Sequence, residues 1–233
     1  MQKAKITLCA HQPAYMPWLG YLDRIQQSDI FVFLDNVQFE KNSFTNRNRI
    51  KTQSGIKWLT VPVKLRGHLT STMLETAISA DQPWSRKHLS AIEASYGKAP
   101  LFKQNFPKIR HLLNGSETTL ADLCWAQLQF WMSEFAITTL VVRASALNLK
   151  CKKSELILEL CESLGAARYL SGPFGKDYLD ESAFAQAGIE IEYQKFEHPV
   201  YQQLWGDFIP GLSCLDFWMN AGAGSVFNAH DVA

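Results

Sequence analysis

The first part of the chain alternates apolar runs with polar loops. Residues 5–10 alternate between polar and apolar positions and predict a β-strand. In residues 19–28 the apolar positions recur every three residues, which predicts a short helix. Residues 30–34 are continuously apolar, a pattern typical of a strand that is buried on both faces of a parallel sheet. The opening therefore predicts a strand, helix and strand, a unit whose crossover is right-handed in nearly all proteins.

The middle of the chain predicts a β-hairpin followed by helices. Residues 39–65 read as two strands about the turn sequence QSG, and Pro62 places the second strand at a sheet edge or a bulge because it cannot donate to a ladder. From Trp84 to Tyr96 an apolar, aromatic or histidine side chain recurs every four residues, which predicts a helix with one buried face. Apolar positions in residues 120–135 indicate another long helix.

The last part of the chain returns to alternating strands and helices. We expect strands at residues 138–145, 167–172 and 189–196, a helix capped by Ser154 that ends at Gly165, a small helix at 182–187 and another that begins near Ser213. This order predicts a mostly parallel sheet flanked by helices, a Rossmann-like three-layer α/β fold with a β-hairpin insertion. No repeat or linker interrupts it, so residues 1–233 are expected to form a single domain.

Composition narrows the class of protein. With 233 residues, of which 47% are hydrophobic, the chain can bury a substantial core, which excludes a disordered or fibrous protein. The 23 basic and 22 acidic residues leave a net charge of +1, so no overall field attracts nucleic acid or an anionic membrane. The five cysteines form no CxxC pair, and no apolar run approaches the roughly 20 residues of a membrane span. We expect a cytoplasmic protein with free thiols and no signal peptide.

A rigid loop follows the first predicted strand, with the sequence HQPAYMPWLGY. Its two prolines restrict the backbone and would hold His11, Gln12 and Tyr15 in a fixed arrangement. His11 follows the first predicted strand and Asp35 follows the second, so both are expected at the carboxyl edge of the sheet, where ligands bind in open α/β folds. His11 is a candidate general acid or base. The alternative is a strand-end histidine that caps a backbone group, with Tyr15 and Trp18 as packing residues.

A second group of candidates follows the buried strand, and its members are polar or basic: Asp35, Gln38, Asn46, Arg47, Asn48 and Arg49. Guanidinium groups bind phosphate oxygens in pairs and asparagines add directional hydrogen bonds, so the segment 41–51 is a candidate phosphate site. The alternative is a solvated basic strand.

Further candidates lie near the later strands. His198, Tyr201 and Gln203 follow the strand at 189–196, and their loop could reach the same crevice as His11; a turn histidine beside a proline is the alternative. Ser171 and Gly172 belong to a short glycine-containing loop that is either a backbone anion nest or a plain loop, and Ser171 lacks the GxSxG context of a nucleophile. The chain contains no Walker or GxGxxG motif, and no metal site is predicted because zinc or calcium ligand spacings are absent.

Several short motifs resemble those of the WbqC-like family, in the same order and over nearly the whole chain: HQPAYMPWLGY, FVFLDNVQF, NRNRIK, WLTVPV, YLSGPFGKDYL, and HPVYQQ followed by FIPGLSCLD. The resemblance implies a role in the biosynthesis of O-antigen or other surface polysaccharides. It implies a small-molecule substrate, a nucleotide-linked amino sugar, and a transferase that moves an acyl or aminoacyl group to the sugar amine.

Such a transfer assigns roles to the candidate residues. His11, oriented by Asp35, is the expected base, with His198 as a further catalytic candidate; Gln12, Asn46 and Asn48 are possible oxyanion donors. Arg47 and Arg49 would bind the pyrophosphate, and Tyr15, Trp18 or Tyr96 would stack on a ring. Two alternatives stay open: a nucleotidyltransferase-like enzyme, although its HxGH-type signature is absent, and a non-catalytic module that binds a nucleotide sugar. No cofactor is identified and the oligomeric state is not predicted.

Overall fold

The computed structural model describes residues 5–64 and 71–224, which form two compact units. Unit 1 takes its described residues from Met1–Gln12, Gly20–Asp35 and Thr138–Glu197. Unit 2 takes them from Pro13–Leu19, Asn36–Ile137 and His198–Ala233. Each unit is thus assembled from three separate stretches of chain. The predicted α/β class with a separate β-hairpin is confirmed.

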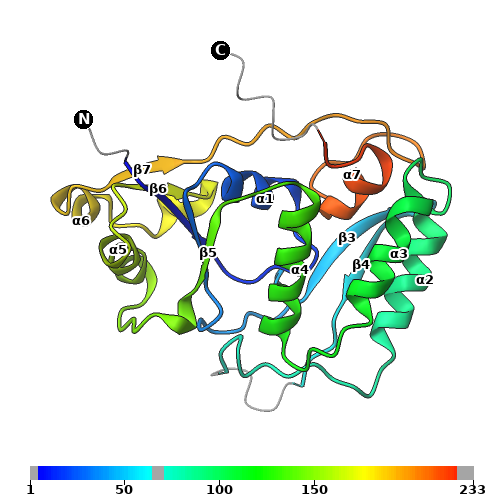
Figure 1. Ribbon diagram of the computed structural model, residues 1–233, viewed down its shortest axis with the longest axis horizontal. Coiled ribbons are helices and arrows are strands. Elements are labelled where there is room, and N and C mark those ends of the chain that lie inside the picture. The colour runs from blue at the N-terminus through cyan, green and yellow to red at the C-terminus, as the bar shows by residue number, and fades with distance from the viewer. Residues whose placement is uncertain (1–4, 65–70, 225–233) are drawn as a thin grey trace. The chain divides into compact units, whose positions relative to one another are not determined.

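Unit 1 is built around a five-stranded sheet in the order β5-β2-β1-β6-β7, and all of its pairings are parallel (Figure 1). Its strands are β1 (Thr7–His11), β2 (Ile30–Phe33), β5 (Leu140–Arg143), β6 (Arg168–Ser171) and β7 (Glu190–Tyr193). All four residues of β2 are buried, as its unbroken apolar run predicts. His11 pairs with Phe33 in the register of β1 and β2, so these strands end at the same edge.

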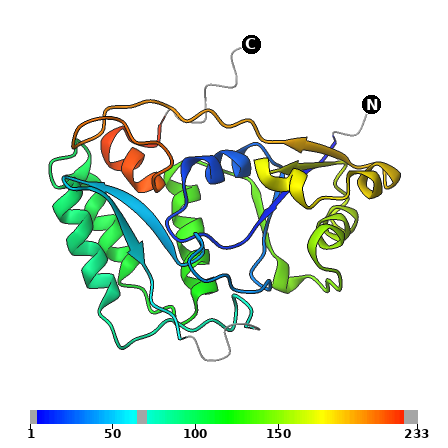
Figure 2. The same ribbon diagram turned by 180° about the vertical axis from the view of Figure 1, so that it is seen from behind.

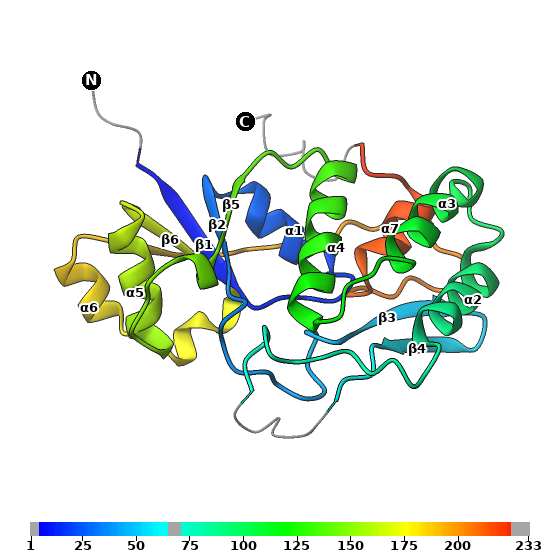
Figure 3. The same ribbon diagram turned by 60° about the horizontal axis from the view of Figure 1, so that its bottom comes forward.

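Helices connect the parallel strands of unit 1: α1 (Leu19–Gln26), α5 (Lys153–Ser163) and α6 (Glu181–Gln186). The connection from β1 to β2 runs across the sheet in one direction. The connections from β5 to β6 and from β6 to β7 run in the opposite direction. Right-handed crossovers therefore place α1 on one face and both α5 and α6 on the other (Figure 3). The sheet is covered on both faces, as a parallel sheet requires.

The expected cap of α5 is wrong, although the end of that helix is confirmed. The residue before α5 is Lys152, with no side-chain cap, and Ser154 lies within the first turn. The Ser154 hydroxyl instead accepts a hydrogen bond from the Asp180 backbone N–H at 2.8 Å, which ties α5 to the start of α6. Gly165 follows the helix with a φ of +67°, a conformation that favours glycine.

The strand order of unit 1 reverses between β1 and β6. The chain moves from β1 through β2 to β5 on one side of the sheet, and then returns to β6 and β7 on the other side. In open parallel sheets such a reversal opens a crevice beyond the carboxyl ends of the two strands, and ligands bind in that crevice. The residues at these ends are His11 on β1 and Ser171 on β6.

Unit 2 contains the predicted hairpin, with β3 (Arg47–Thr52) paired antiparallel to β4 (Gly55–Thr60). Gly55 has a φ of +104° at the turn, and β4 ends before Pro62. The helices of this unit are α2 (Trp84–Tyr96), α3 (Phe102–Leu113), α4 (Leu120–Glu134) and α7 (Cys214–Asn220). Helix α2 packs on β3 and on α3, and α3 also contacts α4 and α7 (Figure 2).

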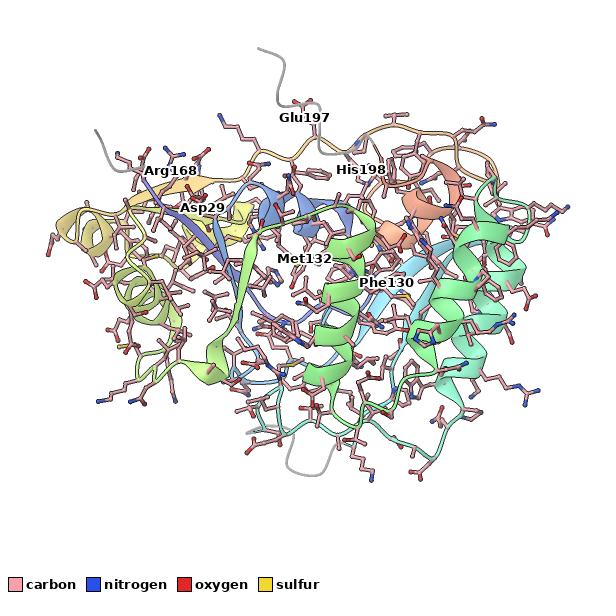
Figure 4. All side chains as sticks on the ribbon, in the orientation of Figure 1. Asp29, Phe130, Met132, Arg168, Glu197 and His198 are labelled. Atoms are coloured by element: carbon pink, nitrogen blue, oxygen red, sulfur yellow. The ribbon has the colours of Figure 1, made fainter. Side chains whose placement is uncertain are left out.

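Aromatic side chains fill the core of unit 2. Phe130 on α4, labelled in Figure 4, contacts Trp218 edge-on with ring centroids 5.7 Å apart, and Trp131 contacts the same indole at 5.4 Å. Trp131 and Trp218 are almost completely buried. Their large apolar surfaces fix α4 against α7, because burial of an aromatic side chain supplies more free energy than burial of a smaller one.

Two kinds of feature are absent from the described residues. No helix among them combines the length and the apolar character needed to cross a bilayer. In residues 5–64 and 71–224, no group of three or more histidine, cysteine, aspartate or glutamate side chains is arranged to hold a metal ion.

Candidate functional site

His11 ends β1 at the reversal point of the sheet in unit 1. Its Nδ1 lies 2.8 Å from the carbonyl oxygen of Gln12, and because a carbonyl can only accept, Nδ1 carries the proton and Nε2 has the lone pair. The ring contacts Tyr21 of α1 edge-on at a centroid distance of 5.0 Å. Burial, and then the nearby charge of Arg24, lower the pKa of His11 to about 3. The imidazole is therefore neutral at pH 7.

Asp35 lies at the same edge as His11, as the sequence predicts, but its carboxylate binds residues that follow β5. Oδ2 accepts hydrogen bonds from Arg143 Nε at 2.6 Å and from the Ser145 hydroxyl at 2.7 Å, and Oδ1 accepts one from the Ser145 backbone N–H at 2.8 Å. Asp35 is fully buried. These bonds connect the ends of β2 and β5. The orientation of His11 by Asp35 stays a prediction, while the structure gives the imidazole Nδ1–H an acceptor at Gln12.

Arg24 is a member of this region that the sequence did not single out. It lies on α1, three residues after Tyr21, and only 6% of it is exposed. Its Nε is buried and has no hydrogen-bond partner among residues 5–64 and 71–224. The sequence pattern of a short amphipathic helix predicts that an arginine faces solvent. The spacing of three residues between Tyr21 and Arg24 was the available signal against this, because it places both side chains on one face of the helix.

Ser171 and Gly172 lie at the carboxyl end of β6, directly beside β1. Ser171 is fully buried and its hydroxyl donates to the Gly172 carbonyl at 3.1 Å. A Cβ atom on Gly172 would lie 2.2 Å from Arg24 Nη1, so the guanidinium occupies the space that a side chain would take. The two predicted residues therefore come together with His11 and Arg24 at one edge of one sheet.

A second polar cluster lies in unit 2 around Asp216 of α7. Tyr96 donates to Asp216 Oδ2 at 2.8 Å and Tyr201 donates to Oδ1 at 2.7 Å. Gln203 donates to the Tyr201 hydroxyl at 3.2 Å. Burial raises the pKa of Asp216, while the two tyrosine hydrogen bonds and the charge of Lys51 oppose this rise. Three of the sequence candidates, Tyr96, Tyr201 and Gln203, thus belong to one network.

Lys51 connects this cluster to the hairpin. Its ammonium donates to Gln203 Oε1 at 3.1 Å, to the Gly206 carbonyl at 3.2 Å and to the Asp207 carbonyl. Lys51 is only 2% exposed. The basic-strand alternative is therefore wrong for this residue, because its charge is buried and holds the segment from Gln203 to Asp207 against β3.

Arg47 and Arg49 of the hairpin lie beside a row of aromatic rings. The rings of Trp18, Phe44 and Trp58 form a row with centroid distances of 5.3 and 5.8 Å. The guanidinium carbons of Arg47 and Arg49 lie 4.3 and 5.7 Å from the centre of the Trp58 ring. Such guanidinium–indole contacts are stabilising. A role in phosphate binding for these arginines stays a prediction.

The polar side chains around this row mostly bind the backbone of unit 2. Asn46 donates to the Val61 carbonyl at 3.0 Å and Asn48 donates to the Met16 carbonyl at 2.6 Å. Tyr15 is fully buried, and its hydroxyl shares a hydrogen bond of 2.7 Å with His88. Gln38 is exposed and forms an isolated bridge with Thr72. Burial lowers the pKa of His88 to about 4, in keeping with its predicted position on the inner face of α2.

His198 belongs to unit 2, whereas His11 and Asp35 belong to unit 1. Its ring, labelled in Figure 4, stacks on Tyr201 at a centroid distance of 6.3 Å and contacts Phe208 edge-on at 5.5 Å. Its Nδ1 lies 2.9 Å from the Pro199 carbonyl. The catalytic role of His198 stays a prediction.

Two surface hollows have linings that include none of the predicted residues. One, of about 450 Å³, is lined by residues of α3 and α4, and the other, of about 260 Å³, by residues of α6 and β7 and the turn between them. The size of a hollow is a weaker guide here than the chemistry, because the lining of the larger one is mainly apolar, whereas the reversal point of the sheet carries His11 and Arg24.

Comparison with known proteins gives a consistent result. A model of the WbqC-like protein family matches residues 12–227. The uncharacterized protein Rv1507c of Mycobacterium tuberculosis is 34% identical over 214 residues, which are 91% of this chain and 92% of that protein. No solved structure matches the chain. The family match covers more than nine tenths of the sequence, and the chain belongs to the WbqC-like protein family.

Proposed function

We propose that this protein acts on a nucleotide-linked amino sugar in surface-polysaccharide biosynthesis and transfers an acyl or aminoacyl group to the sugar amine. Membership in the WbqC-like family supports the assignment to polysaccharide biosynthesis. The observation that carries the chemistry is the position of His11 at the carboxyl end of β1, where the strand order reverses. A neutral imidazole at this point has a nitrogen lone pair that can accept a proton.

In the proposed reaction, Nε2 of His11 accepts a proton from the amine as the amine nitrogen attacks the carbonyl carbon of the donor. The new bond joins nitrogen to carbon, and the bond from that carbon to the leaving group breaks, with the electron pair departing on the leaving group. The Nδ1–H bond to the Gln12 carbonyl supports this role because it keeps the lone pair on Nε2. The side chain of Gln12 is the nearest candidate in sequence to donate to the developing oxyanion.

The test incubates the protein with nucleotide-linked amino sugars and a panel of acyl and aminoacyl donors, and measures the mass of the sugar. We expect a mass gain equal to the acyl group, and a loss of turnover of about a hundredfold or more in His11→Ala. His111→Ala is the matched control, because His111 is an exposed histidine on α3 of unit 2.

Three outcomes would contradict the proposal. Full turnover in His11→Ala would remove the base from the mechanism. Binding of nucleotide sugars without any mass gain would indicate a non-catalytic binding module. Release of pyrophosphate from a nucleoside triphosphate, with transfer of the nucleotide, would indicate a nucleotidyltransferase.

A further inference from the structure

We infer that Arg24 binds a phosphate group of the ligand at the carboxyl edge of unit 1, between the ends of β1 and β6. The inference rests on the proposed function for the identity of the ligand, a phosphorylated sugar or donor. The anion site itself stands on the charge and geometry of unit 1 and needs no transfer reaction.

The first argument is the charge of Arg24. Among residues 5–64 and 71–224, none forms an ion pair with this guanidinium, although Arg24 is only 6% exposed. The preceding residue, Asp23, accepts hydrogen bonds from the amides of Gln27 and Gln194 at 2.7 and 2.6 Å. A buried charge without an opposite charge is unfavourable by several kcal/mol in general. A bound anion would supply the missing charge.

Three ionisable groups that interact with the charge of Arg24, those of Cys9, Tyr169 and His11, are neutral at pH 7 and do not balance it. Burial raises the pKa of the Cys9 thiol to about 11, and it raises the pKa of Tyr169 well above its usual value. Burial and Arg24 itself lower the pKa of His11 to about 3. An incoming phosphate therefore encounters a positive charge that these three groups do not balance.

The second argument is the geometry of Gly172. Its φ is −68° and its ψ is 167°, an extended conformation that any residue adopts, so the backbone does not require glycine. A Cβ atom there would lie 2.2 Å from Arg24 Nη1. The absent side chain leaves room for the guanidinium beside the end of β6. Gly172 thus helps to hold Arg24 at the reversal point, where parallel sheets bind ligands.

The third argument compares Arg24 with the other arginines of unit 1. Arg143 is paired with Asp35 at 2.6 Å. Arg168, labelled in Figure 4, lies at the amino end of β6 and is paired with Glu190 and Glu192 at 3.7 and 3.3 Å. Within residues 5–64 and 71–224, Arg24 is the one of these three arginines without a carboxylate partner, and its guanidinium lies beside Gly172 at the reversal point of the sheet. Its planar fork matches phosphate oxygens.

The experiment measures binding of inorganic pyrophosphate to the full chain by isothermal titration calorimetry at pH 7. Removal of one charge-assisted contact to phosphate typically weakens binding by tenfold or more. We expect at least that loss in Arg24→Gln. Gly172→Ala keeps the charge but displaces the guanidinium, and we expect a smaller loss of a few fold. Arg168→Gln is the matched control and should bind within about twofold of the wild type.

Separate titrations identify the source of the phosphate. If a nucleoside diphosphate binds more tightly than acetyl phosphate, and this binding depends on Arg24, the ligand is the nucleotide-linked sugar. If acetyl phosphate binds more tightly, the ligand is a phosphorylated acyl donor. Absence of pyrophosphate binding in the wild type at millimolar concentration, equal binding by Arg24→Gln, or an equal loss in Arg168→Gln would each overturn the inference. If the protein transfers an acyl group but its anion binding does not depend on Arg24, the phosphate site is rejected and the proposed function stands. If anion binding depends on Arg24 but no acyl group is transferred, the proposed function is rejected and the phosphate site stands.

Discussion

Replacement of Arg24 by methionine is expected to stabilise unit 1, because the substitution removes a buried charge without an opposite charge. Methionine has an unbranched side chain that preserves much of the packing of the arginine stem. The matched substitution is Arg143→Met in the same unit, where the arginine is paired with Asp35. The two substitutions are chemically identical and should change stability in opposite directions.

The magnitudes follow from the surroundings of each arginine. Arg24 is 6% exposed and has no carboxylate partner among the described residues, so removal of its charge should raise the free energy of unfolding by about 1–3 kcal/mol. Arg143→Met leaves the fully buried carboxylate of Asp35 without its cation, although the two hydrogen bonds from Ser145 stay. Because the side chain of Arg143 is 26% exposed, we expect a loss of about 2–3 kcal/mol, at or just below the lower limit for fully buried pairs.

The distribution of tryptophans allows the two units to be measured separately. All seven tryptophans lie in unit 2, so their fluorescence during urea unfolding reports that unit and serves as an internal control. Hydrogen exchange of peptides from β1 and β6, followed by mass spectrometry, reports the free energy of opening of unit 1. A loss of more than about 1 kcal/mol in Arg24→Met would show that Arg24 stabilises the fold, and would refute the reasoning. Pyrophosphate should protect β1 and β6 in the wild type and not in Arg24→Met.

Three further predictions test the polar groups described above. Asp35→Ala should lower the free energy of unfolding of unit 1 by about 3 kcal/mol in urea titrations followed by circular dichroism, since it leaves Arg143 and Ser145 without their acceptor; a change under 1 kcal/mol would contradict this role. Lys51→Met should destabilise unit 2 by about 2–4 kcal/mol, measured by tryptophan fluorescence, because three oxygen acceptors lose their donor. His88 has a pKa of about 4 in the fold against 6.5 in the unfolded chain, so its contribution to stability is complete above pH 6.5 and is lost as the pH falls toward 4, a loss of about 3 kcal/mol. His88→Gln should flatten the pH profile of stability in that window, and an unchanged profile would reject the assignment.

The elements with strong local patterns were predictable from the sequence. The unbroken apolar run predicts β2, and the apolar or aromatic side chains that recur every four residues predict α2. The two patterns differ because β2 is buried on both faces of a strand, whereas α2 is buried on one face of a helix. The same patterns place His11 and Asp35 at one edge of the sheet, since parallel neighbours end together. The helix α3 was not predicted, although Phe106, Ile109 and Leu113 show a helical spacing. Pro107 interrupts its hydrogen bonding and no side chain caps its start.

Arg24 and the division into units could not be predicted, because both depend on contacts between distant parts of the chain. Gly172, which leaves room for the Arg24 guanidinium, lies 148 residues later in the sequence. The first boundary between the units falls between Gln12 and Pro13, inside a motif that reads as one loop. For Lys51 the sequence predicts exposure where the structure shows burial. Alternation along β3 indicates a solvent-facing cation, whereas the ammonium is buried and donates to carbonyl groups more than 150 residues later in the sequence.

The electrostatics of unit 1 connect the two proposals. A histidine with a pKa of about 3 accepts protons poorly at pH 7, because a general base is most effective when its pKa lies near the working pH. Burial is the main cause of that low value and the positive charge of Arg24 adds to it, so a phosphate bound to Arg24 would offset the second contribution alone and raise the pKa of His11 in part. Ligand binding would then increase the basicity of the residue that must accept the amine proton. In this mechanism His11 is a weak base before the ligand binds, and the substrate's own anionic group increases its basicity for the transfer.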